Sequence, residues 1–283
     1  MCYNNSTTIH LHHLMKYERK GEPAMKQEYQ IQDGVFSQYT GHETTFTVPD
    51  GVTEIGYGAF HRNYMRCVVI PEGVRAIQRL AFMDCRNLCD IVFPETLTEI
   101  KKQAVCDCHH LDEIVLPNSL ISVGDRIFDD CDGIHEITIY GEHFDIDEER
   151  FDAYIWDDIA EEYGLCEENT TEVSRQIRHV MVDELPRLLI NGEYDHLYMD
   201  EQYRCETIAR VLHHQPGNEN LLRTAKAHLP AIFPYLVQNP ETVRFLLQKG
   251  MIENAHLDEY IALAAKHNAA DTERILTEYQ SAL

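Results

Sequence analysis

The sequence predicts an α/β solenoid of short parallel strands with an N-terminal β-hairpin cap, followed by an all-α domain of helical repeats. Two observations predict this fold class. The first is a pair formed by an apolar residue and proline, which recurs at intervals of 22 or 23 residues as Val48-Pro49, Ile70-Pro71, Phe93-Pro94 and Leu116-Pro117. A fixed period of this length is the signature of stacked repeats. The second is a change from Val173 onward, where apolar residues recur every three or four positions, as in amphipathic helices.

Each repeat places apolar residues at the same positions after its proline. The third and sixth residues are apolar in every unit, and a pair follows, as in Ala59-Phe60 and Ala81-Phe82. A cysteine occupies one further position in three of the four units, at Cys85, Cys108 and Cys131. Because no single unit can bury its apolar side alone, neighbouring units must stack and share one core. We therefore expect the three cysteines to stack as small buried hydrophobes.

Each repeat ends on a short alternating stretch that predicts a strand. In the second unit the buried positions are Leu88, Ile91 and Phe93, and the last residues follow the period-2 pattern of a strand with one buried face. The proline follows the strand, where it ends the hydrogen-bonded ladder and turns the chain. We expect these strands to form a parallel sheet along one side of the solenoid.

Taken together, these positions resemble the BspA-like class of bacterial leucine-rich repeats over about residues 46–140. A unit of that class runs apolar-Pro, two apolar positions, Ala-Phe, Cys, then Leu and a short strand. The resemblance implies an α/β leucine-rich-repeat solenoid. The segment from Tyr29 to Gly41 is similar to the hairpin that often opens such arrays, and it would cap the first repeat and cover its exposed edge.

The second half predicts helices. After Tyr140 the repeat stops, and the acidic stretch 142–149 is expected to be a boundary. Helical spacing then recurs in the segments 155–163, 173–189, 208–212, 221–229, 231–237, 240–249, 257–267 and 271–279. Pro240 and Gly250 suit the start and the end of one of these helices, and Asp271 is expected to cap the last one.

The segment from Val243 to Leu276 is similar to ankyrin helix pairs, although it lacks the usual Thr-Pro-Leu-His turn. A generic antiparallel helical array is the alternative. Either arrangement would cover the last leucine-rich repeat and stop end-to-end association.

We thus expect three parts: residues 1–26 as a disordered or wrongly assigned N-terminal extension, 27–145 as the leucine-rich-repeat domain with its cap, and 146–283 as the α-helical domain. The codons for Lys20-Gly21-Glu22 must be rich in purines, and a ribosome-binding site is a purine-rich sequence of this kind. Met25, just downstream, is therefore the expected natural start.

The charge balance restricts the class of partner. The chain carries 24 Lys+Arg against 48 Asp+Glu, which gives a formal net charge of −24. Such a surface repels phosphate backbones and anionic lipids, so nucleic acid and membrane surfaces are not expected partners, whereas a basic protein is compatible. The alternative is that the acidity only confers solubility. The nine cysteines are an odd number, and residues 1–20 contain no apolar core of signal-peptide length, so a cytoplasmic protein with reduced thiols is expected.

The sequence contains no familiar catalytic motif. It lacks a G-x-S-x-G elbow, a phosphate-binding loop and an H-E-x-x-H pair, so we expect neither an enzyme nor a cofactor. The best metal candidate is Cys106-Asp107-Cys108-His109-His110, because thiolate and imidazole ligands suit zinc. Cys108 falls on the buried repeat position, however, and the other residues are expected around a turn at the surface. No metal site is therefore expected.

The outward positions of the predicted sheet are the candidate binding site. They are Val69, Asp90, Val92, Glu113, Val115, Glu136 and Thr138. Neighbouring strands lie about 4.8 Å apart, so these positions form one column of three acids and one column of mostly β-branched residues. Unpaired like charges stacked in this way repel each other, and a cationic partner would relieve the repulsion. The alternative is that the acids only keep the sheet soluble.

We therefore expect a monomeric, non-catalytic protein–protein interaction module that binds a protein or peptide, of basic character, on the exposed strand face. Two alternatives stay open. The first is a metal-dependent enzyme or accessory subunit built on Cys106, Cys108 and the neighbouring histidines. The second is a surface adhesin, a function that the resemblance implies for many relatives with this repeat and that requires export.

Overall fold

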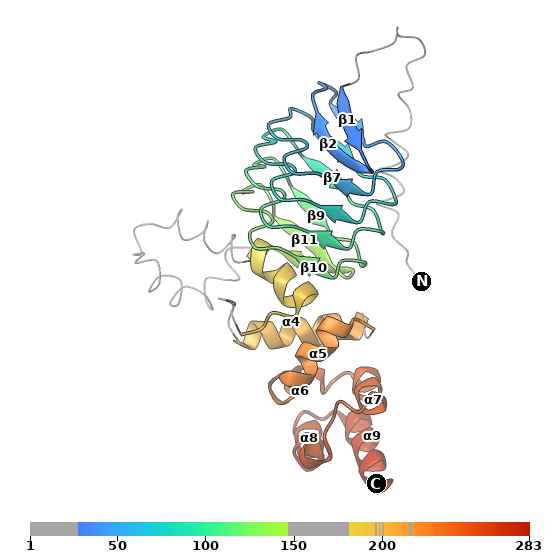
Figure 1. Cartoon of the computed structure of the whole chain (residues 1–283). Coiled ribbons are helices and arrows are strands. Elements are labelled where there is room, and N and C mark those ends of the chain that lie inside the picture. The colour runs from blue at the N-terminus through green and yellow to red at the C-terminus, as the bar shows by residue number, and fades with distance from the viewer. Residues whose placement is uncertain (1–27, 147–180, 196, 198, 200, 215–216) are drawn as a thin grey trace, which may run out of the picture.

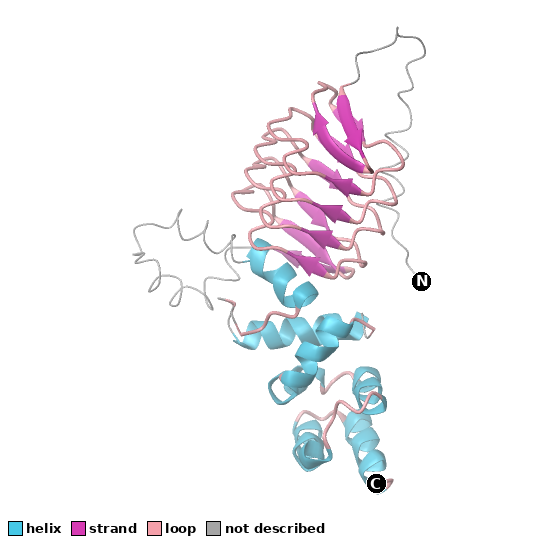
Figure 2. Cartoon of the chain, in the orientation of Figure 1, coloured by secondary structure: helices cyan, strands magenta, loops and turns pink. Residues whose placement is uncertain are grey.

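The computed structural model describes residues 28–146, 181–214 and 217–283, except residues 196, 198 and 200. A solenoid of short strands is followed by a stack of helices (Figures 1 and 2). The predictions for residues 1–26, for a helix at 155–163 and for the first part of a helix at 173–189 lie outside the described residues. Within the described parts of the chain, no helix combines the length and the apolar character needed to cross a membrane.

The predicted N-terminal hairpin is confirmed. β1 (Tyr29–Gln32) pairs antiparallel with β2 (Val35–Tyr39), and the turn residues Asp33 and Gly34 both have a positive φ, as a type I′ hairpin turn requires. β2 then pairs with the first strand on one side of the solenoid. Phe36 stacks on Phe60 of the first repeat with 5.0 Å between ring centroids, so apolar burial holds the cap on the core.

The solenoid carries parallel strands on two sides, whereas the sequence predicted one side only. The predicted side holds β3 (Thr45–Thr47), β5 (Cys67–Val69), β7 (Asp90–Val92), β9 (Glu113–Val115), β11 (Glu136–Ile139) and β12 (Glu142–Asp145). The opposite side extends the hairpin with β4 (Glu54–Ile55), β6 (Ala76–Ile77), β8 (Glu99–Ile100) and β10 (Ser122–Val123). These four strands have two residues each, too few to show an alternating pattern in the sequence.

Every repeat also crosses between its two sides through a turn that holds two left-handed positions. The first position has φ 60° at Gly58, 59° at Leu80, 54° at Gln103 and 53° at Arg126. The second position is left-handed at Arg62, Asp84, Asp107 and Asp130. Side chains other than glycine adopt this φ at a steric cost, which the stacking of repeats must offset. Backbone hydrogen bonds between repeats help to offset this steric cost, such as the bond from the Phe60 N–H to the Ala81 carbonyl at 2.8 Å.

The helices follow the predicted order, with shifted bounds. Residues 181–191 are helical and end in the π-helical turn η1 (Arg187–Asn191). The remaining elements are α4 (Glu201–His214), α5 (Glu219–Ala227), α6 (Leu229–Leu236), α7 (Pro240–Gln248), η2 (Asn254–His256), α8 (Leu257–Lys266) and α9 (Ala270–Ser281). The predicted start of α7 at Pro240 is confirmed, and Gly250 follows its end with φ 64°. The ankyrin resemblance of this region stays a prediction.

The predicted cap of the last helix is wrong. Ala269 is the N-cap residue of α9, and Asp271 lies inside the first turn. There its carboxylate pairs with Arg274 at 2.8 Å, one turn along the helix. Asp271 still favours the helix start, because a negative charge in the first turn interacts well with the helix dipole.

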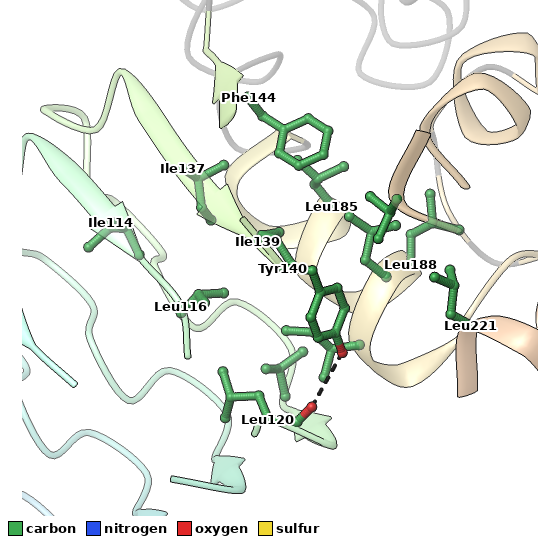
Figure 3. Close-up of a cluster of buried hydrophobic side chains, with 14 of the residues drawn as sticks. Ile114, Leu116, Leu120, Ile137, Ile139, Tyr140, Phe144, Leu185, Leu188 and Leu221 are labelled. Atoms are coloured by element: carbon green, nitrogen blue, oxygen red, sulfur yellow. Dashed lines mark hydrogen bonds between the residues drawn. The ribbon is translucent and has the colours of Figure 1, made fainter. Parts of the chain in front are cut away.

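The helical region covers the last repeat, as expected. Figure 3 shows Tyr140 and Phe144 of the solenoid facing Leu185 and Leu188 of the helical stretch 181–191, and all four side chains are buried. The carboxylate of Asp183 accepts a hydrogen bond from the backbone N–H of Phe128 at 3.1 Å. Apolar packing and side-chain hydrogen bonds to the backbone therefore join the two regions.

The stretch 142–149, which was expected to be a boundary, begins with the strand β12. β12 pairs antiparallel with β11, and Phe144 and Ile146 are buried while His143 and Asp145 are exposed. This alternation was present in the sequence, but the acidic residues around it favoured a boundary. Arg210 of α4 holds the strand in place: Nη2 donates to the His143 carbonyl at 2.9 Å, and the guanidinium lies 4.6 Å from the centre of the Phe144 ring.

Candidate binding face

The candidate site is the set of side chains that point outward from β5, β7, β9 and β11, named here the strand face. The register places Cys67 beside Asp90 and Val69 beside Val92 in one sheet. In the other sheet it places Glu113 beside Glu136 and Val115 beside Thr138. The two sheets meet where β7 contacts β9. Acids and β-branched residues therefore stack in two separate columns, as the repeat spacing predicted.

The exposed apolar part of the strand face is a valine column. Val69 and Val92 are half-buried, and Val115 is 53% exposed. The residues before them in the strands, such as Val68 and Ile91, point into the core and are buried. Because the backbone of each strand is held by its neighbours and by the core, the three valines form a narrow apolar strip on a rigid support.

The prediction that Thr138 belongs to the exposed column is wrong. Its side chain is only 5% exposed, because β12 lies beside β11 and places His143 next to it. The ring Nδ1 of His143 lies 3.0 Å from Thr138 Oγ1 and 2.7 Å from Glu136 Oε1. The exposed β-branched column therefore ends at Val115. Sequence reasoning missed His143 because it treated the stretch 142–149 as a boundary and expected no strand there.

The acids of the other column are also not all unpaired, contrary to the expectation. Glu136 meets His143, and the Cys67 thiol donates to the Asp90 carboxylate, with Sγ 3.9 Å from Oδ2. Glu113 lies between them and is exposed. Burial, together with the Asp90 carboxylate, raises the pKa of Cys67 to about 11, so this thiol is protonated at neutral pH. The repulsion within the column is smaller than a bare row of acids would give.

A further row of acids borders the valine column, and sequence reasoning did not consider it. Asp50, Glu72 and Glu95 each follow the proline of a repeat, and all three are exposed; they are named here the corner acids. Glu72 comes three residues after Val69, and Glu95 comes three residues after Val92. The carboxylate of Glu72 accepts a hydrogen bond from the Glu95 backbone N–H at 3.1 Å. The valine column thus has acids before it and after it along the direction of the strands.

The repeated cysteines form a buried ladder, as predicted. The thiol of each donates to a backbone carbonyl of the preceding repeat: Cys85 to Phe60 at 2.9 Å, Cys108 to Phe82 at 3.2 Å and Cys131 to Val105 at 3.0 Å. Hydrogen bonding with the Cys108 thiol, together with burial, raises the pKa of Cys85. These thiols are protonated hydrogen-bond donors, whereas a metal ligand must be a thiolate.

The neighbouring Cys/His residues do not converge on one point. Cys106 was expected at the surface, but it is 4% exposed, and burial raises its pKa to about 12. His109 and His110 are exposed, as expected. His109 lies 3.6 Å from Asp132, and the ring Nδ1 of His110 lies 2.6 Å from the Arg86 carbonyl. Among the residues that the structure describes, no group of three or more His, Cys, Asp and Glu could hold a metal ion.

The period, the short strands and the stacked turns define the first half of the chain as a leucine-rich-repeat solenoid. Residues 29–154 match the family model described as the BspA type leucine rich repeat region, in six copies. This repeat region is therefore a BspA-type leucine-rich repeat, as the sequence resemblance implied. Repeats of this class support a role in protein interaction or as a surface repeat, and they are typically non-catalytic.

Solved structures with a similar repeat come from several bacteria. A leucine-rich repeat protein from Bacteroides capillosus is 28% identical, with 39% of this chain and 91% of that chain covered and a TM-score of 0.36. The T. pallidum leucine-rich repeat protein is 26% identical, with 42% of this chain and 71% of that chain covered and a TM-score of 0.34. A comparison with curated proteins found no match.

Proposed function

We propose that this chain is a non-catalytic interaction module that binds a protein or peptide on its strand face. The observation that carries the proposal is the valine column with acids on both sides. An exposed apolar strip loses unfavourable contact with water when a partner covers it. The strip is short, so the affinity must also come from the polar groups at its borders.

The partner in this proposal is basic. The chain has a formal net charge of −24, and Asp90, Glu113, Glu72 and Glu95 border the valine column. A negative field of this kind attracts a cationic partner and speeds its association. Because the solenoid is stacked and hydrogen-bonded between repeats, the face is already formed before binding, which lowers the entropy cost of association.

We place the module in the cytoplasm. Cys85, Cys108 and Cys131 act as hydrogen-bond donors through their thiols, and a reducing compartment keeps thiols in that state. The competing location is the cell surface, because repeats of this class also serve as surface repeats. Cell fractionation followed by detection of the native chain distinguishes them, because a chain recovered at the cell surface would contradict a cytoplasmic module.

A pull-down with two matched variants tests the binding face. The first variant, Glu113→Lys with Val115→Lys, changes two exposed positions of the strand face. The control, Glu253→Lys with Thr277→Lys, makes the same change in charge on the helical region, at positions that are also exposed. Circular dichroism first establishes that all three proteins are folded. We expect the wild type and the control to retain the same protein from a lysate and the strand-face variant to lose it. Equal retention by both variants would contradict the proposal.

A further inference from the structure

The spacing of the valine column restricts the shape of what can lie along it. β5 pairs with β7, β7 contacts β9, and β7 and β9 follow one another along the solenoid in Figure 1. Each of the three strands contributes one valine to the column. Paired strands are about 4.8 Å apart, so Val69 and Val92, which are register partners, form two rungs at about that spacing. Val115 is the third rung, on β9, which contacts β7 as the next strand along the solenoid. A partner that lies along the axis and contacts every rung must therefore repeat at nearly the same distance.

An extended chain does not meet this requirement, whereas an α-helix does. An extended segment presents residues on the same side about every 6.8 Å. This distance exceeds the spacing of the valines, so the second contact residue already misses its valine. A helix advances about 5.4 Å per turn, so its mismatch over three rungs is only about 1 Å. A helix along the axis thus places one turn, and one apolar residue, on each valine.

The acidic borders then specify the flanks of that helix. Asp90 and Glu113 precede the valines within their strands, whereas the corner acids Glu72 and Glu95 follow the valines just past the strand ends, so the two rows of acids lie at opposite ends of the strands. The hydrogen bond from the Glu95 N–H to the Glu72 carboxylate holds that side chain at the corner. A helix with an apolar stripe and with lysines or arginines on both sides of the stripe complements this arrangement.

We propose that the strand face binds a basic amphipathic α-helix that lies along the solenoid axis with one helical turn per repeat. This inference rests on the proposed function and adds to it the chemical class and the orientation of the partner. The apolar stripe of the helix covers Val69, Val92 and Val115, and its cations meet the acids on either side. About three turns of helix span the three rungs.

Three synthetic peptides of about 14 residues test the proposal with the intact chain. The first has leucines in a helical stripe flanked by lysines. The second has the same composition, reordered so that leucine and lysine alternate as in a strand. The third keeps the helical stripe but replaces lysine with glutamate. Fluorescence anisotropy measures the affinity of each peptide. We expect the first to bind at least about tenfold more tightly than the other two, with an affinity that falls as salt increases.

A pair of variants tests whether the peptide occupies the strand face. Glu95→Lys with Glu113→Lys reverses one acid on each side of the valine column. Glu253→Lys with Glu278→Lys makes the same change in charge on exposed residues of the helical region. We expect the first pair to weaken binding of the basic helix about tenfold or more and the control to leave it within about twofold.

The outcomes separate this inference from the proposed function. If the alternating peptide binds as tightly as the helical one, the partner is not a helix, although the face can still bind protein. If no peptide binds while the pull-down partner still depends on Glu113 and Val115, the helical inference is wrong and the proposed function stands. If the basic helix binds both variant pairs equally well, it lies elsewhere, and the strand face is contradicted as its site.

Discussion

The side-chain amide of Asn191 pairs with the backbone of Val123 as a further strand would. Its Oδ1 accepts the Val123 N–H at 2.8 Å, and its Nδ2 donates to the Val123 carbonyl at 2.7 Å. Val123 belongs to β10, the last strand on its side of the solenoid, whose outer edge would otherwise be unpaired. Unpaired strand edges are templates for association with other chains. Asn191 therefore covers the edge of the sheet at Val123.

Removing this amide should destabilise the junction. Asn191→Ala leaves the N–H and the carbonyl of Val123 without partners at a partly buried site, and we expect a loss of about 2 kcal/mol in the free energy of unfolding. Asn191→Asp keeps the acceptor for the N–H but loses the donor to the carbonyl. Its free energy of unfolding should therefore differ clearly from that of the wild type. Urea denaturation measures both. Wild-type stability in Asn191→Ala would show that the pairing contributes nothing.

Arg210 should protect the other sheet at the same end. It donates to the His143 carbonyl on the outer side of β12, and its Nε meets Glu142 at 2.7 Å. Arg210→Glu brings a carboxylate next to Glu142 and frees the strand edge, so we expect a lower melting temperature and self-association. Light scattering and thermal denaturation measure these effects.

Arg244→Glu is the matched control for that change. Arg244 also pairs with an acid, Glu241 at 2.8 Å, but it does so on the surface of α7, away from any strand. We expect this variant to stay monodisperse, with a change in stability below about 1 kcal/mol. Self-association of both variants to the same extent would mean that the charge change, and not the strand edge, is responsible.

Two glycines of the solenoid should respond differently to alanine. Gly58 has φ 60°, but an added Cβ would meet only the Cβ of His61 at 3.9 Å, so Gly58→Ala should cost about 1 kcal/mol through backbone strain alone. At Gly124 an added Cβ would lie 2.2 Å from the backbone nitrogen of Lys102. Gly124→Ala must therefore push two repeats apart, and it should destabilise more than Gly58→Ala in urea denaturation. The reverse order would contradict the close stacking at Gly124.

Alkaline pH should weaken the fold through Cys67. Its pKa is raised from an ordinary value of about 9 to about 11 in the folded chain, by burial and by Asp90. The unfolded chain therefore releases this proton at lower pH than the folded chain does. The resulting stabilisation is complete below about pH 9 and is lost as pH rises toward 11.

Urea denaturation at a series of pH values checks this. Cys67→Ser removes the titrating thiol, so its stability should fall less than that of the wild type between about pH 9 and pH 11. Cys89→Ser serves as the control, since that cysteine lies nearby and is partly exposed as well. Identical pH profiles for the wild type and Cys67→Ser would contradict the assignment.

The sequence by itself determined the solenoid, its period, the hairpin and the two columns of the strand face. It could do so because a repeat encodes the same local information several times: which residue enters the core, where proline ends a strand and which positions alternate outward. Val92 and Val115 were predictable for this reason, and so was the ladder of Cys85, Cys108 and Cys131.

Only the tertiary structure decided what ends the repeats and what covers individual side chains. Thr138 is buried by a strand that the acidic composition concealed, and Cys106 is buried although Asp107, His109 and His110 follow it closely in sequence. Asn191 meets Val123 and Arg210 meets Glu142 across 68 positions of sequence in each case. No local pattern predicts such pairs. A repeated position appears in every unit and can be recognised by its period, whereas a side chain that pairs with one edge of a sheet occurs only once.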